Sequence, residues 1–91
     1  MTNDPHGYRR LYDELTDLET EIRTLGFDAA ADRLRFAKRF YSGSSTEFMI
    51  ETRSVLWAVL KEELTIPAPI RSRMAWIMDQ ITEGFRRAGG T

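Results

Sequence analysis

The spacing of the apolar residues is the feature that most constrains the fold of this chain. Over most of its 91 residues they recur three and four positions apart, which places them on one face of an α-helix. A half-buried strand would instead alternate apolar and polar residues between turn signals, and no segment of the sequence does so. The pattern therefore predicts an all-α fold, a small bundle of four helices joined by short loops.

Four periodic segments, separated by turn residues, set the bounds of the expected helices. These segments cover residues 5–25, 29–41, 45–64 and 69–88, and together they form a single domain that spans residues 1–91. The third segment has the widest apolar face, which is typical of a helix that contacts neighbours on more than one side. We therefore expect it to be the central helix.

Residues at the segment ends favour defined helix caps. Asp4 and Asp28 are expected to cap the first and second helices, and Gly26 to end the first helix in a left-handed conformation. Ser44 and Glu47 have the spacing of a capping box. In such a box the Ser44 hydroxyl accepts from the Glu47 amide, while the Glu47 carboxylate accepts from the Ser44 amide. The third helix is therefore expected to begin directly after Ser44.

The composition excludes several kinds of chemistry. The chain has no cysteine, which excludes disulfides, thiolate zinc sites and cysteine nucleophiles. It has one histidine, His6, so a histidine-rich metal site is excluded as well. Asp13, Asp17 and Glu21 lie four positions apart on the first expected helix, but such a stripe is more typical of a solvated face than of a metal site. We expect no cofactor, no metal and no enzymatic activity.

No part of the sequence indicates a membrane or a secretory route. Its apolar runs fall far short of the roughly 20 residues that cross a bilayer. The first residues also lack the basic and apolar regions of a secretory signal. A cytoplasmic protein without a membrane partner is therefore expected.

One face of the second expected helix is basic. Arg35, Lys38 and Arg39 fall on the same side of that helix, beside two phenylalanines, and such a patch can contact phosphates and stack on bases. The chain as a whole has a net charge of −1, whereas nucleic-acid-binding modules are usually basic. Most of its acidic residues lie in the first third of the chain, so pairing of this basic face with the first helix is the favoured interpretation. A nucleic-acid-associated regulator is the alternative function, and nucleic acid the less favoured partner.

The chain has more large apolar side chains than a protein of its length readily buries. Trp57, Trp76, Met49 and Met78 are the candidates for a protein-binding surface, because tryptophan and methionine pack well against varied partners. In most small bundles these residue types belong to the core, and the sequence leaves both interpretations open. The first function hypothesis is a non-enzymatic protein-interaction module, such as an adaptor, antitoxin or immunity-type protein. Its partner would be another protein or a second copy of the chain in a homodimer.

The stretch from Ala31 to Arg53 combines a short helical motif with a helix start. It begins with Ala-Asp-Arg-Leu, continues after a gap with Ser-Ser-Thr-Glu-Phe-Met over residues 44–49, and then reaches Arg53. This arrangement resembles a group of short, uncharacterised bacterial all-helical proteins, although Ser45 stands where that group commonly has glycine. The resemblance implies a helical fold and no particular activity. Within the stretch, Arg33 and Arg53 are predicted to tie the second and third helices together through carboxylates.

Overall fold

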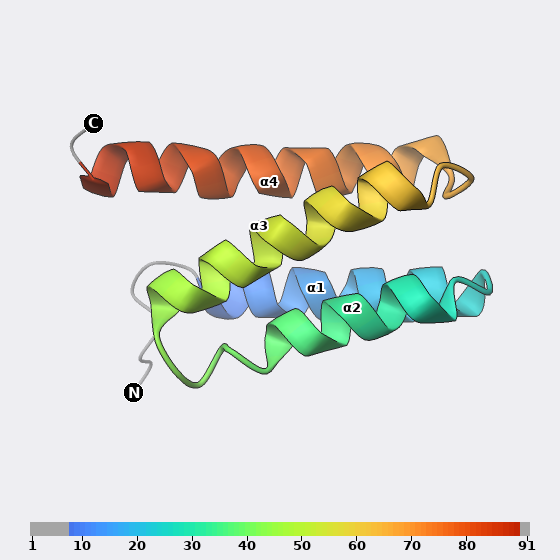
Figure 1. The fold of residues 1–91 in the computed structure, drawn as a ribbon, viewed down its shortest axis with the longest axis horizontal. Helices are drawn as coiled ribbons and strands as arrows, with labels where there is room; N and C mark the ends of the chain where they lie inside the picture. Colours follow the sequence, from blue (N-terminus) through green and yellow to red (C-terminus); the bar gives the residue numbers. More distant parts are fainter. Residues whose placement is uncertain (1–7, 90–91) are drawn as a thin grey trace.

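The computed structural model describes residues 8–89, which form four α-helices and contain no strand (Figure 1). The predicted all-α fold with four helices is therefore confirmed. Its elements are α1 (Tyr8–Thr24), α2 (Asp28–Lys38), α3 (Ser45–Glu62) and α4 (Ala68–Gly89). These bounds agree with the predicted ones to within a few residues. The start of the first predicted helix and its cap, Asp4, lie outside the described residues.

Successive helices pack against one another. α2 lies against α1, α3 against α2 and α4 against α3, in a molecule with extents of 37, 30 and 18 Å. α1 and α4 run along the long axis, and α3 crosses obliquely between them (Figure 1). α3 therefore has neighbours on two sides, as its wide apolar face predicts. Within residues 8–89, no helix is long and apolar enough to cross a membrane.

The buried side chains lie at helical spacing and form one core. α2 contributes mainly alanine to this core, which lets it lie close to α1, because the distance between packed helices depends on the side chains at the contact. The core consists of Leu15, Leu18 and Ile22 from α1, Ala30, Ala31, Leu34 and Ala37 from α2, Phe48, Val55, Leu56 and Val59 from α3, and Ile66, Ile70, Met74, Ile77 and Ile81 from α4 and the turn before it.

The turn between α1 and α2 ends one helix and starts the next without a linker. Gly26 has a φ of 97°, the left-handed conformation that the sequence predicts for it and that glycine adopts without strain. The amide of Phe27 donates to the carbonyl of Ile22 at 2.9 Å, and that of Gly26 to the carbonyl of Arg23 at 3.0 Å, which together form a Schellman motif. The prediction that Asp28 caps α2 is wrong, because α2 already begins at Asp28 and no side chain caps it. Asp28 instead places negative charge in the first turn, where the helix dipole favours it.

α2 ends three residues earlier than predicted, because the chain continues in tighter turns. The amides of Arg39, Phe40 and Tyr41 each donate to the carbonyl three residues before them, at 3.1 Å. Such bonds are common where helices end. The ring of Tyr41 then lies against those of Tyr12 and Phe48, with ring centroids 4.7 and 5.5 Å away. These aromatic contacts link the turn to both α1 and α3.

The first turn of α3 is capped by a side chain. Ser44 has the extended backbone of an N-cap residue, and its hydroxyl accepts a hydrogen bond of 3.2 Å from the amide of Glu47. This is the first half of the predicted capping box. The second half is not formed, because among the described residues the Glu47 carboxylate makes no hydrogen bond to the Ser44 amide. The cap therefore depends on Ser44, and Glu47 contributes its charge to the helix start.

Replacing Ser44 by alanine is expected to lower the free energy of unfolding by about 1 kcal/mol, because one amide of the first turn loses its acceptor. Glu47→Ala removes only a favourable charge near the helix dipole and should cost less, about 0.5 kcal/mol. Urea denaturation followed by circular dichroism measures both variants. A larger loss for Glu47→Ala than for Ser44→Ala would show that the complete capping box forms in solution.

Two arginines from the stretch that resembles the bacterial group connect α3 to its two neighbours. The Arg33 guanidinium lies 2.9 Å from the Glu62 carboxylate and joins α2 to α3. Arg53 does not reach α2, contrary to the prediction. It donates to the hydroxyl of Thr82 at 3.3 Å and its guanidinium lies 5.0 Å from the ring centroid of Phe85, so it joins α3 to α4. The reason is that α3 lies between two helices, and its different faces contact different partners.

Candidate functional site

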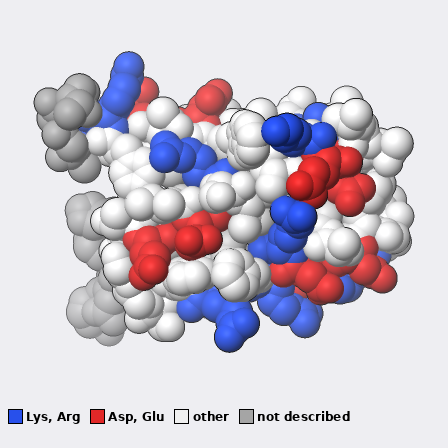
Figure 2. All heavy atoms as spheres, viewed as in Figure 1, with Lys and Arg blue, Asp and Glu red and all other residues white. Residues whose placement is uncertain are grey.

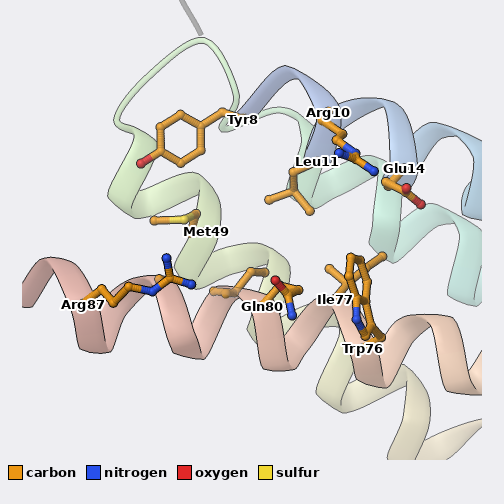
Figure 3. A pocket seen from close by; sticks show the side chains of 11 residues that line it. Tyr8, Arg10, Leu11, Glu14, Met49, Trp76, Ile77, Gln80 and Arg87 are labelled. Carbon is orange, nitrogen blue, oxygen red and sulfur yellow. The ribbon is translucent and has the colours of Figure 1, made fainter. Parts of the chain in front are cut away.

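A groove of about 720 Å³ lies between α1 and α4 (Figure 3). Its floor is apolar and is shared by three helices, since Leu11 comes from α1, Met49 from α3, and Ile77 and Ile81 from α4. Its rims carry polar and aromatic side chains. On the α1 side these are Tyr8, Arg10 and Glu14, and on the α4 side Trp76, Gln80 and Arg87.

The groove exists because α1 and α4 are held apart. Each packs on an inner helix rather than on the other, and one arginine bridges them directly. The guanidinium of Arg73, on α4, lies 3.1 Å from the Glu21 carboxylate and 3.3 Å from that of Glu14, both on α1. This bridge ties the middle and the end of α1 to the first part of α4. The remaining halves of the two helices border the groove.

Trp76 stands on the α4 rim of this groove with 54% of its surface exposed (Figure 3). It directly precedes Ile77, which is buried, and adjacent helical residues point about 100° apart. Trp76 therefore lies at the edge of the apolar face of α4 rather than within it. A tryptophan in this position adds a large contact surface that the core does not use.

Each rim of the groove carries one arginine. Arg10, on α1, is exposed and makes no ion pair with another described residue. Arg87, on α4, lies 3.8 Å from the carboxylate of Glu83, but Arg86 already holds that carboxylate at 2.9 and 3.0 Å. The acidic residue that lines the groove, Glu14, faces Arg73. Among the described residues Arg10 therefore has no ion pair, and Arg87 shares its carboxylate with a cation that lies closer to it.

The four residues predicted to form a protein-binding surface lie in two different grooves. Met49 and Trp76 border the groove between α1 and α4, whereas Trp57 and Met78 border a smaller one of about 260 Å³ between α3 and α4. Trp76 and Met78 face different sides because residues two apart on a helix point about 200° apart. Trp57 is 55% exposed, and the ammonium of Lys61 lies 4.5 Å from its ring centroid. The structure therefore does not bring the two tryptophans together.

The basic face of α2 is largely occupied by a carboxylate of α1. Glu19 accepts hydrogen bonds of 3.0 Å from both Arg35 and Lys38, and one of 3.1 Å from Arg23. Its side chain is only 8% exposed. The favoured interpretation, that the basic face pairs with the first helix, is thus confirmed for two of its three cations. Arg39 is exposed and makes no such pair among the described residues.

Glu19 is the charged residue of this cluster that the sequence analysis did not single out. Burial raises the pKa of its carboxyl, but the hydrogen bonds from Lys38 and Arg23 and the charges of Lys38 and Arg35 outweigh this effect. Its pKa therefore lies below the ordinary value of 4.5. A signal was present in the sequence, because Glu19 lies four positions after Leu15 and three before Ile22, which places it on the apolar stripe of α1.

The described residues, 8–89, contain no group of three or more histidine, cysteine or acidic side chains placed to hold a metal ion. The acidic stripe of α1 is divided among different partners. Asp13 pairs with Arg9 at 3.3 Å, while Glu21 faces Arg73. His6 lies outside the described residues.

Comparison with known proteins finds no matching family model, no matching curated protein and no matching solved structure. The resemblance of Ala31 to Arg53 to a group of short bacterial helical proteins stays a prediction. What the molecule binds is therefore inferred from its grooves and their charges.

Proposed function

We propose that this protein is a non-enzymatic protein-interaction module that binds its partner in the groove between α1 and α4. The observation that carries the proposal is Trp76, which is half exposed beside an apolar groove of about 720 Å³. Tryptophans in such positions are frequent anchors of binding energy, because a partner that covers them removes a large apolar surface from water. The floor formed by Leu11, Met49 and Ile81 would be covered in the same step.

The composition supports a binding role rather than a chemical one. The chain has no cysteine and one histidine, and the proposal requires neither a metal nor a cofactor. Adaptors, antitoxins and immunity proteins all act by occupying a surface of another protein, and this module would belong to that class. The partner would be either another protein or a second copy of this chain in a homodimer.

We do not extend the alternative function, a nucleic-acid-associated regulator. Arg35 and Lys38 already face Glu19, so binding a phosphate would require these two cations to exchange one anion for another. Basic and acidic side chains are also interspersed on the face shown in Figure 2, without a continuous basic stripe. Arg39 is the remaining cation of that predicted contact.

Trp76→Ala is expected to abolish retention of the partner from an extract of the source cells by the immobilised protein. Trp57→Ala is the matched control, because the two tryptophans are exposed to almost the same extent, 54% and 55%, in different grooves. A protein retained by the wild type and by Trp57→Ala would then be purified and its affinity measured by calorimetry. Trp76→Ala should weaken that affinity by about 2 kcal/mol, or roughly thirtyfold.

Two other outcomes are informative. If no retained protein depends on Trp76, or if the dependence lies on Trp57, the groove between α1 and α4 is not the binding surface. If light scattering shows a dimer of the wild type that persists in high salt and becomes a monomer in Trp76→Ala, the partner is a second copy of the chain.

A further inference from the structure

We infer that the partner segment in the groove between α1 and α4 is an amphipathic helix of about three turns with acidic residues on both edges of its apolar stripe. This inference rests on the proposed function and specifies the kind of partner. Two independent observations carry it, namely the shape of the groove and the charges on its rims.

The shape of the groove favours a helix over an extended peptide. Its two walls are themselves helices that run in opposite directions (Figure 1). The α4 residues that line it extend from Trp76 to Arg87, a length of about 16 Å, or three turns. A peptide that binds as a β-strand adds to a sheet edge, and residues 8–89 contain no strand for it to pair with. A helix needs only apolar side chains at every third or fourth position to fill the floor.

The rims determine which charges the partner helix carries. Two cations line the groove, Arg10 on one rim and Arg87 on the other. Arg10 has no ion pair with another described residue, and Arg87 lies 3.8 Å from the Glu83 carboxylate, which Arg86 holds more closely at 2.9 Å. The acid in the lining, Glu14, is paired with Arg73. An arginine recognises a carboxylate through two parallel hydrogen bonds, so each rim favours aspartate or glutamate opposite it. A helix with lysine at those edges would meet like charge on both sides. The acids must flank the apolar stripe because the two arginines flank the groove.

A displayed library of helices of about 14 residues tests this inference, because the sequence of the partner is not needed. The library fixes apolar residues at helical spacing and randomises both the apolar side chains and the residues on each edge of the stripe. Selection against the purified protein should enrich aspartate and glutamate at both edges. Each selected peptide, made without tryptophan, is then titrated against the Trp57→Phe variant, in which Trp76 is the one tryptophan and its emission reports directly on the groove.

The charge requirement is tested with two double variants that remove the same number of positive charges. Arg10→Gln with Arg87→Gln removes the two rim cations and should weaken binding of a selected acidic peptide about tenfold. Arg9→Gln with Arg86→Gln is the matched control, because these neighbours pair with Asp13 and Glu83 and do not line the groove. The control should change affinity less than about threefold, and the difference should shrink as salt is raised.

The possible results separate this inference from the proposed function. Enrichment of acidic residues in the selection, together with weaker binding of the selected peptides to the variant with Arg10→Gln and Arg87→Gln, supports both the inference and the proposed function. Peptides that need Trp76 but show no preference for acids, or prefer bases, overturn the inference and leave the interaction module standing. A selection that gives no peptide dependent on Trp76 overturns both. A wild-type dimer that dissociates on Trp76→Ala assigns the groove to a second copy and overturns the inference.

Discussion

Replacing Phe48 by alanine is expected to lower the free energy of unfolding by about 4 kcal/mol. Phe48 heads the fully buried side chains by size, and its ring packs edge-to-face against Tyr41 at 5.5 Å. The truncation removes apolar surface and leaves a cavity where α3 meets the turn that follows α2. Domains of this size have about 5–10 kcal/mol in total, so the variant should be close to unfolding at room temperature. Urea denaturation with far-ultraviolet circular dichroism measures the loss.

Thr52→Val is the control for this prediction. Thr52 lies one turn further along α3 and is equally buried, and its hydroxyl has no hydrogen-bond partner among the described residues. Valine has nearly the same shape and removes this unpaired hydroxyl, so stability should stay the same or rise by about 1 kcal/mol. If Thr52→Val lowers the free energy of unfolding as much as Phe48→Ala does, the Thr52 hydroxyl makes a hydrogen bond in solution that the structure does not show.

Glu19→Gln is expected to lower the free energy of unfolding by about 2 kcal/mol. The substitution keeps the shape of the side chain and removes the charge that Arg23, Arg35 and Lys38 share. These three cations would then repel one another around a neutral amide. The loss falls below that of a fully buried ion pair because the cations are partly solvated, with Arg35 at 65% exposure.

Glu21→Gln provides a matched control on the same helix. Glu21 is 48% exposed and pairs with one cation, Arg73, which keeps its second carboxylate, Glu14. Its replacement should cost less than about 0.5 kcal/mol, as for other exposed pairs. Equal losses for Glu19→Gln and Glu21→Gln in thermal unfolding would contradict the central position of Glu19.

The same carboxylate should make stability depend on acidity. Because the pKa of Glu19 is lower in the folded protein than its ordinary value of 4.5, the ionised form favours folding. This contribution is fully present above pH 4.5 and is lost as the pH falls through the lower folded pKa. The melting temperature of the wild type should therefore fall below that pH more steeply than that of Glu19→Gln. Parallel curves for the two proteins would show that Glu19 does not contribute this effect.

The sequence alone predicted those features that depend on residues close together in the chain. The helices and their approximate bounds follow from apolar residues three and four positions apart. The left-handed stop at Gly26 and the cap at Ser44 involve hydrogen bonds that span no more than five residues. The error at the start of α2 was a shift of one residue, because Asp28 is the first residue of the helix and Phe27 occupies the cap position.

The candidate site depended on which helices lie side by side, and periodicity within a helix carries no information on this. Trp57 and Trp76 have similar exposure and similar chemistry, but they border different grooves because α4 packs on α3 and is held apart from α1. Arg53 turned to α4 rather than α2 for the same reason.

The sequence therefore determined the helices, their ends and the apolar face of each, because hydrogen bonds and side-chain spacing within a helix are local. Only the tertiary structure decided that Glu19 pairs with three cations and that Arg10 and Arg87 lie on opposite rims of one apolar groove. The physical reason is that burial and charge pairing between helices depend on distances across the whole fold. Those distances follow from how all four helices pack together.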